Sequence, residues 1–392
     1  MATHYANGKT TTSGLVFMYD TIDKENCYKG EPTTNLVDYS EYQYLADNYT
    51  AALGGWDTFE GNFLIDVINK VPGYTNRSIK MTSVQANVYK YHFNVPLTSG
   101  QTYTVSFWGK ATSAGNYGNF LLADGPSGYL VFEPGGYSSV TTEFTRFTYT
   151  FVVPSTGTYN FATYLYGDGQ VVWLSGFQLE NKSHATQYLP SNGAATLRSA
   201  TQALRPLVNN SSLDLTNVSF DSNAQLYFDG TNDYFDIPYS STLDTPNGCT
   251  YELMVYPSSN GEILSRGSSD AVDNPRLYVE TSGNIYWDWS NGVDRYIYST
   301  SNLTMNSWNH LVCTATPSST LNVYINGQAA GSGQTMPSTL PNTSDAIRIG
   351  SSTWVGRYFN GKVSMLKIYN RALTQTEITQ NYNSYKSRFN LA

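Results

Sequence analysis

Residues 306–325 read NSWNHLVCTATPSSTLNVYI, and residues 359–373 read FNGKVSMLKIYNRAL. Apolar and polar residues alternate in both stretches, and a turn-forming segment at residues 316–319 separates two of the runs. Alternation over short runs is typical of half-buried β-strands. The same pattern recurs along most of the chain, for example in residues 144–153 and 171–179. The sequence therefore predicts an all-β protein.

Two segments depart from the alternation. In residues 374–382, Thr374 is followed three positions later by Glu377, which is a capping-box pattern and predicts one short helix. Residues 189–210 contain two prolines and no strand pattern. We expect the chain to cross between domains there.

Length and composition narrow the function classes. A chain of 392 residues suits two domains, each with its own core. Lys and Arg number 22 against 30 Asp and Glu, a net charge of −8, so the chain lacks the positive field of a nucleic-acid binder. Only 13% of residues are charged, and 33 are tyrosines. Such a composition favours sugars or proteins as partners.

Membrane insertion and export are not expected. No window approaches the roughly 20 apolar residues that span a bilayer. Residues 1–14 lack the charged and apolar regions of a signal peptide. Cys27, Cys249 and Cys313 are an odd number of widely spaced cysteines, which predicts buried thiols rather than disulfides.

Six segments of the second half carry a family resemblance by their order. They are QLYFDGTNDYFD (225–236), CTYELMVYP (249–257), NSWNHLVCTAT (306–316), LNVYING (321–327), IRIG (347–350) and FNGKVSMLKIYNRALTQTE (359–377). The succession, over about residues 211–385, resembles the laminin-G-like, concanavalin A-like lectin domain. The resemblance implies an antiparallel β-sandwich.

The opening strand of that domain lies far upstream. Residues 14–20, GLVFMYD, resemble the start of the same lectin-like domain. We therefore expect an N-terminal arm at 1–13, a discontinuous lectin-like sandwich at 14–30 plus 196–392, and an inserted sandwich with its linker at 31–195. Insertion between elements is tolerated because loop-closure entropy grows slowly with length. The predicted fold class is two antiparallel jelly-roll sandwiches, one inserted into the other.

The insert has a resemblance of its own. The segments GGWDTFEG (54–61), YTVSFWGKA (103–111) and GFQLENKSHATQYLP (176–190) resemble jelly-roll carbohydrate-binding modules. Members of that family often place acidic residues beside a structural calcium just before the last strand. Ser175 and Gly176 stand there in this chain, so the resemblance does not extend to that calcium.

The N-terminal segments resemble a further group of proteins. The start MATHYANGKTTTSGLVF and the segment GEPTTNL (30–36) are similar to virion surface proteins of tailed bacteriophages: head decoration proteins, head fibres and tail adhesins. The resemblance implies synthesis in the host cytoplasm, a place on the virion surface, and capsid or tail proteins as partners. We also expect a homo-oligomer.

Catalysis is not expected. Glycosidases need two carboxylates about 5–9.5 Å apart across the scissile bond. The E-x-D-x-x-E strand of lectin-fold glucanases is missing, and Glu252 stands without a nearby acidic residue. The four histidines are scattered. We therefore predict no catalytic residues and no enzyme, although distant strands could still bring carboxylates together.

Aromatic residues beside polar ones are the best candidates for glycan binding, because flat rings stack on sugar C–H faces. In IYWDWSNGVDRYIY (285–298), alternation places Tyr286 and Asp288 on one face of the strand and Trp287 and Trp289 on the other. The remaining candidates are Trp354, Arg357 and Tyr358 in a later loop, and Trp56, Tyr117 and Tyr129 in the insert. The alternative is that these rings fill sandwich ends or an interface.

One oxygen-rich loop is a candidate calcium site. It contains Asp229, Asn232, Asp233 and Asp236. Oxygen ligands suit calcium, but the spacing is not that of an EF-hand. The alternative, which the sequence favours, is a turn in which the Asp and Asn side chains bond to nearby backbone. Calcium is the one cofactor that the sequence suggests.

The expected function is that of a non-enzymatic bacteriophage virion surface protein with weak, multivalent binding to host surface glycans. Two alternatives remain open. One is a purely structural protein that stabilises the capsid. The other is an exported bacterial carbohydrate-binding protein.

Overall fold

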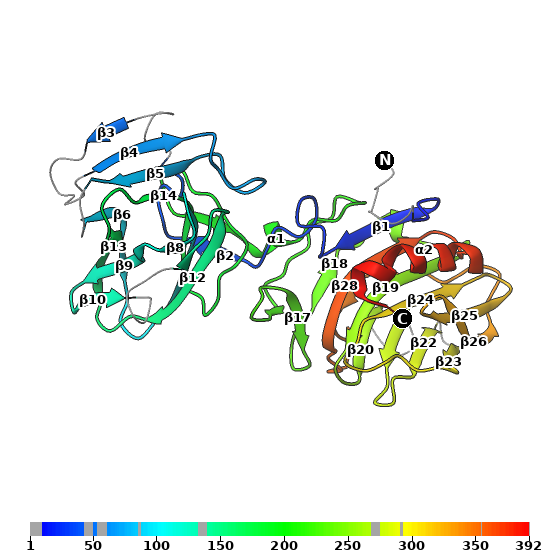
Figure 1. The fold of residues 1–392 in the computed structure, drawn as a ribbon. Coiled ribbons are helices and arrows are strands. Elements are labelled where there is room, and N and C mark those ends of the chain that lie inside the picture. The colour runs from blue at the N-terminus through cyan, green and yellow to red at the C-terminus, as the bar shows by residue number, and fades with distance from the viewer. Residues whose placement is uncertain are drawn as a thin grey trace. The chain divides into compact units, whose positions relative to one another are not determined.

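The structure is a computed structural model that describes residues 10–42, 50–52, 61–84, 88–131, 139–267, 275–290, 293–353 and 355–391. The chain forms two compact units. The first comprises residues 1–32, 199–221 and 225–392, and the second comprises residues 33–198 and 222–224. Both are built of antiparallel strands (Figure 1), which confirms the predicted all-β class.

The first unit contains an eight-stranded sheet. Its order is β16-β17-β28-β19-β24-β25-β26, and β1 also pairs with β28. The strands are β1 (Leu15–Asp20), β16 (Ser219–Phe220), β17 (Leu226–Asp229), β19 (Cys249–Pro257), β24 (Asn309–Ala315), β25 (Thr320–Ile325), β26 (Gln328–Thr335) and β28 (Asn360–Tyr369). In β1, Tyr19 lies opposite Leu366 of β28, so strands from the two ends of the chain are neighbours.

A six-stranded sheet forms the second layer of this unit. Its order is β18 (Phe235–Ile237), β27 (Ile347–Ile349), β20 (Gly261–Arg266), β21 (Arg276–Val279), β22 (Ile285–Ser290) and β23 (Asp294–Tyr298). Alternate side chains from both sheets form one continuous apolar core, in which Tyr251 of β19 contacts Trp287 of β22 with ring centroids 5.7 Å apart. Each strand buries one face in this core, and the apolar side chains of the strand lie on that face.

Helix α2 (Gln375–Phe389) packs on the other face of the eight-stranded sheet (Figure 1). Thr374 caps it, and Glu377 completes the predicted capping box. The helix is longer than predicted because Tyr385 and Phe389 continue its buried face. It ends at Asn390, which has the left-handed conformation with φ 51°. The other helical elements are the short α1 (Ala200–Ala203) and η1 (Ser241–Leu243).

The second unit has its own layers. One sheet has the order β12 (Thr145–Val152), β7 (Thr102–Ala111), β14 (Val171–Glu180), β5 (Ser78–Ser83), β4 (Gly61–Asp66) and β3 (Thr50–Ala52). Another has the order β10 (Gly128–Val131), β9 (Gly118–Gly125), β13 (Gly157–Leu165) and β6 (Val88–Leu97). Two further pairs are β11 (Ser139–Val140) with β8 (Gly115–Asn116), and β15 (Thr196–Arg198) with β2 (Thr33–Asn35). A core rich in Phe side chains lies within this unit.

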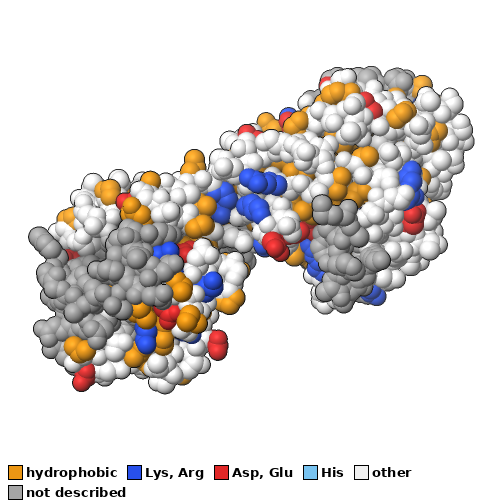
Figure 2. Space-filling model, turned by 90° about the horizontal axis from the view of Figure 1, so that it is seen from above, with side chains coloured by type: hydrophobic (Ala, Val, Ile, Leu, Met, Phe, Trp, Pro, Cys, Tyr) orange, Lys and Arg blue, Asp and Glu red, His pale blue; other side chains and the backbone are white. Residues whose placement is uncertain are grey.

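The three cysteines are free and buried, as predicted. Burial raises the pKa of the Cys27 and Cys249 thiols to about 12. None of the helices in the described part of the chain is both long and apolar enough to cross a membrane. On the face drawn in Figure 2, uncharged side chains prevail and Lys and Arg occur in small groups.

Candidate functional site

The outer face of the six-stranded sheet in the first unit is the candidate site. Side chains alternate along β22, so Trp287 and Trp289 lie in the core while Tyr286 and Asp288 lie on the opposite face. The same alternation in the neighbouring strands places further polar and aromatic side chains on this outer face.

The strand register aligns these side chains in two rows. In one row each residue is the direct partner of the next across the sheet: Asp236, Arg348, Ser265, Arg276, Asp288 and Tyr296. The second row is Glu262, Tyr278, Tyr286 and Tyr298. Directly opposite side chains in antiparallel strands are close enough to interact. The two rows therefore bring charged groups and tyrosine rings onto one surface.

Buried charged side chains lie on this face beside the tyrosines. Arg276 Nε lies 3.3 Å from Glu262 Oε1, and Glu262 has no exposed surface. Asp288, only 3% exposed, is the cross-strand partner of Arg276 on the other side. Buried charges are costly unless they are paired. Arg276 is therefore paired with Glu262, and the strand register places Asp288 on its other side.

Four tyrosines form what we call the tyrosine face: Tyr278, Tyr286, Tyr296 and Tyr298. The Tyr286 ring lies 5.6 Å from Tyr296 and 4.9 Å from Tyr298 between centroids, and Arg276 lies 5.1 Å from the Tyr286 centroid. Tyr296 and Tyr298, on the edge strand β23, are 38% and 51% exposed. The cluster thus has a buried charge at its side and exposed aromatic surface on the edge strand.

The loop before β28 approaches the tyrosine face. Arg357 is exposed, and its guanidinium lies 5.6 Å from the Tyr278 ring centroid. Tyr358 follows it and pairs with Ser351. The loop can lie against β20 because residue 261 is glycine: a Cβ there would lie 2.3 Å from the Tyr358 carbonyl oxygen. The structure thus places Arg357 against Tyr278, the cross-strand partner of Tyr286, while Trp354 lies outside the described residues.

The candidates in the second unit are placed differently. Tyr117 is buried in the core, and its hydroxyl bonds to Ser113 at 2.9 and 3.0 Å, so its ring is a core element rather than a surface for stacking. Trp56 and the side chain of Tyr129 lie outside the described residues. The glycan-binding role of these two stays a prediction.

The predicted calcium ligands fall into two separate sets. The Asp233 carboxylate accepts hydrogen bonds from the backbone N–H groups of Ser219 and Asp229, and Asp229 accepts from the Thr231 N–H at 2.7 Å. The bond from the Thr231 N–H is that of an Asx turn, whereas Asp233 anchors the backbone of β16 and β17.

The second set is an ion pair at the edge of the sheet. Asp236 binds Arg348 with both oxygens, at 2.8 and 3.0 Å, and this bonding raises the pKa of Arg348. Asn232 is exposed. Over the described ranges, no group of three or more His, Cys, Asp or Glu side chains is placed to hold a metal ion. Calcium binding stays a prediction.

Several members of the site were not identified from the sequence: Glu262, Arg276, Tyr278, Tyr296 and Tyr298. Tyr296 and Tyr298 lie in the aromatic segment 285–298 and share the alternation of Tyr286 and Asp288. Continuing that alternation through the β22–β23 hairpin finds both of them. Glu262 and Arg276 could not be found this way, because their place depends on the register of separate strands.

One known protein family matches part of this chain. Residues 229–379 match the family model described as the concanavalin A-like lectin/glucanases superfamily. This part of the chain has the concanavalin A-like lectin fold. We therefore call the first unit the lectin-like unit. A search of the curated proteins finds no match.

Solved structures resemble the chain at low identity. The binding domain of Paraclostridial Mosquitocidal Protein 1 is 17% identical, with a TM-score of 0.38, and the match covers 46% of this chain and 49% of that one. Domain 4 of an extracellular arabinanase from Geobacillus stearothermophilus, solved with arabinotriose, is 18% identical with a TM-score of 0.36, covering 47% and 93%. A pentraxin from Limulus polyphemus is 17% identical with a TM-score of 0.31, covering 39% and 78%. The match thus spans about half the length of the mosquitocidal binding domain.

Proposed function

We propose that the lectin-like unit binds a glycan on its tyrosine face without cleaving it. The observation that carries the proposal is the exposure of Tyr296 and Tyr298 beside Tyr286, next to the buried Arg276–Glu262 ion pair. A tyrosine has an apolar ring face and a polar hydroxyl. It can therefore pack on the C–H face of a sugar and bond to a neighbouring hydroxyl group.

The charged groups support the surface in two ways. The Arg276 guanidinium lies 5.1 Å from the Tyr286 ring centroid, in a cation–π contact that helps to hold the ring in place. Arg357 is exposed at the same face and offers hydrogen-bond donors to sugar hydroxyls or to an acidic substituent. The binding surface thus has one buried and one exposed arginine against its tyrosine rings.

The placement of the carboxylates of Glu262 and Asp288 favours binding of the glycan without hydrolysis. Glu262 and Asp288 lie on β20 and β22, on either side of β21. Adjacent strands lie about 4.8 Å apart, so the backbones of β20 and β22 lie about 10 Å from each other. Arg276 lies between the two carboxylates, and both are buried. Glycosidase carboxylates must instead reach both sides of one glycosidic bond.

The biological setting that we propose is the surface of a tailed bacteriophage particle. It rests on the resemblance of residues 1–17 and 30–36 to virion surface proteins. On a particle, many copies of a weak site act together, because binding of the first raises the effective concentration of the next. A homo-oligomeric decoration or fibre protein suits this mode. A particle protein without a ligand, and an exported carbohydrate-binding protein, are the competing roles.

The glycan proposal is tested on a glycan array with the full chain and three variants. We expect Tyr298→Ala to weaken binding of the retained glycan about tenfold, since an aromatic contact contributes about 0.5–1.5 kcal/mol beyond its buried area. Tyr298→Phe should keep most of the affinity. Tyr239→Ala is the matched control, since Tyr239 is 43% exposed but follows β18 at the opposite edge of the sheet. Equal binding by all variants would contradict the proposal.

The setting has a separate test. The phage whose genome encodes this chain is purified and studied by mass spectrometry and cryo-EM. We expect both methods to detect the protein, and the map to place it on the capsid or tail surface. Its absence from the particle would contradict the virion role and favour the exported carbohydrate-binding protein. Aromatic surfaces buried at contacts between virion proteins would favour the purely structural role.

A further inference from the structure

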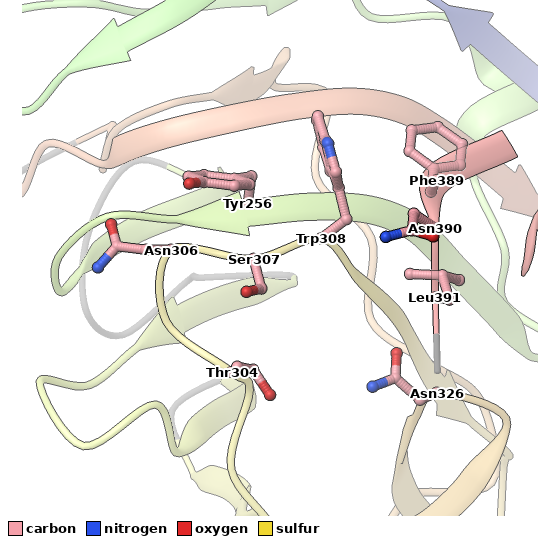
Figure 3. A pocket seen from close by; sticks show the side chains of 9 residues that line it. All are labelled: Tyr256, Thr304, Asn306, Ser307, Trp308, Asn326, Phe389, Asn390 and Leu391. Atoms are coloured by element: carbon pink, nitrogen blue, oxygen red, sulfur yellow. The ribbon is translucent and has the colours of Figure 1, made fainter.

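A pocket lies in the lectin-like unit, apart from the tyrosine face. It has a volume of about 390 Å³ and is lined by nine residues (Figure 3). They come from the end of β19, the loop before β24, the β25–β26 turn and the end of α2. A volume in this range is typical of pockets for small ligands.

Three aromatic rings form one wall of this pocket. Trp308 meets Tyr256 edge to face, with centroids 5.6 Å apart, and meets Phe389 in the same manner at 5.1 Å. Trp308 is only partly buried, so part of the indole is open to the pocket. Figure 3 shows the three rings along one side of the cavity. The wall gives a ligand apolar surface to pack on.

Three asparagines, with Thr304 and Ser307, form the polar part of the lining. Asn326 Oδ1 accepts a hydrogen bond from the His310 backbone N–H at 3.0 Å, which fixes the amide and leaves its Nδ2 as a donor. The side chains of Asn306 and Asn390 have no hydrogen-bond partner within the described part of the chain. Figure 3 shows the amide of Asn390 directed toward the space beside Ser307. The pocket thus presents donors and acceptors together.

The lining is neutral. None of the nine described residues that line the pocket carries a charged side chain. A charged ligand would lose its hydration without gaining an ion pair. A sugar ring has C–H faces for the aromatic wall and hydroxyls that both donate and accept. We propose that this pocket binds one neutral saccharide residue, as a second site that is independent of the tyrosine face.

The asparagines have a competing structural explanation that the test must separate. Asn306, Asn326 and Asn390 all have positive φ, at 54°, 50° and 51°. Asparagine is favoured in this conformation, so each could be present for its backbone alone. Glycine adopts the same conformation without strain. Asn306→Gly and Asn390→Gly therefore keep the backbone and remove only the amide.

The experiment is a titration of the full chain with the methyl glycosides of glucose, galactose and mannose, followed by NMR of the tryptophan indole N–H groups. The variant Trp308→Phe assigns the Trp308 signal. We expect at least one glycoside to shift that signal saturably. Asn306→Gly and Asn390→Gly should each weaken this binding roughly three- to tenfold, as the loss of one hydrogen bond implies. Tyr298→Ala should leave it unchanged, which separates this site from the tyrosine face.

Three results would overturn the proposal. The first is a Trp308 signal that none of the glycosides moves. The second is unchanged affinity in both glycine variants, which would make the asparagines turn residues only. The third is tighter binding of methyl glucuronide than of methyl glucoside, because a neutral lining should disfavour the carboxylate. Unfolded variants are recognised by loss of dispersion in the same spectra, and the glycine changes avoid this outcome by design.

Discussion

At the scale of single residues, the most consequential side chain outside the two sites is Glu252. Its carboxylate is fully buried and accepts hydrogen bonds from Tyr369 at 2.9 Å and Asn381 at 3.0 Å. It also bonds His310 at 2.8 Å. Burial raises the pKa of Glu252, but the Lys367 charge and these hydrogen bonds outweigh it and hold the pKa below 4.5. The charged form is therefore the one that the fold needs.

Replacing this carboxylate tests that conclusion. Glu252→Gln should lower the free energy of unfolding by about 3–5 kcal/mol, because it removes the carboxylate charge that does most to stabilise the buried Lys367 ammonium. Urea denaturation followed by fluorescence measures the change. Glu143→Gln, at an exposed position, is the control and should change little. Equal stability of both variants would mean that Lys367 is neutral in the fold.

At the scale of elements, the alternation of apolar residues and the capping pattern predicted the positions of strands and the start of helix α2, because both depend on neighbouring residues in the sequence. Alternation predicts a strand at residues 171–179, which form β14, and the start of α2 lies at its predicted cap. The site was predicted only in part. Tyr286 and Asp288 were found because alternation along one strand assigns them a face. Arg276 and Glu262 were missed because neighbouring strands, not their own, decide what they contact.

The α2 cap gives a prediction at this scale. Thr374 accepts the Glu377 backbone N–H, and Glu377 reaches back to the Thr374 N–H. Thr374→Ala should lower the free energy of unfolding by about 1 kcal/mol. Thr376→Ala, two positions on and exposed, is the matched control and should not destabilise. Thermal unfolding measures the stability of both variants. A loss in Thr374→Ala alone would come from the cap, and an equal change in both would come from helix propensity.

The same cap predicts a pH dependence. Hydrogen bonds from Arg371, together with those from Thr374, lower the pKa of Glu377 from 4.5 to about 2. A lowered pKa means that the stabilisation is full above pH 4.5 and is lost as the pH falls toward 2. The stability difference between the wild-type chain and Glu377→Gln should therefore shrink across this range. A constant difference would show that Arg371 does not pair with Glu377 in solution.

At the scale of the whole molecule, each unit has a separate apolar core. Every buried core residue of the second unit's main cluster lies within residues 33–198, and the main cluster of the lectin-like unit lies outside them. The ends of this segment also meet, because Thr33 of β2 is the direct partner of Arg198 of β15. We infer that the second unit is an inserted domain that folds by itself.

Excision tests this inference. Residues 33–198 expressed alone should give a β-type circular dichroism spectrum and one cooperative unfolding transition, because their core needs no residue from outside. The complementary chain, with residue 32 joined to residue 199 through a short glycine linker, should also fold, since Thr33 and Arg198 are adjacent and the linker has little distance to span. This chain should keep the glycan affinity of the tyrosine face. An excised segment that aggregates, beside a complement that folds, would show that the second unit depends on the lectin-like unit for its stability.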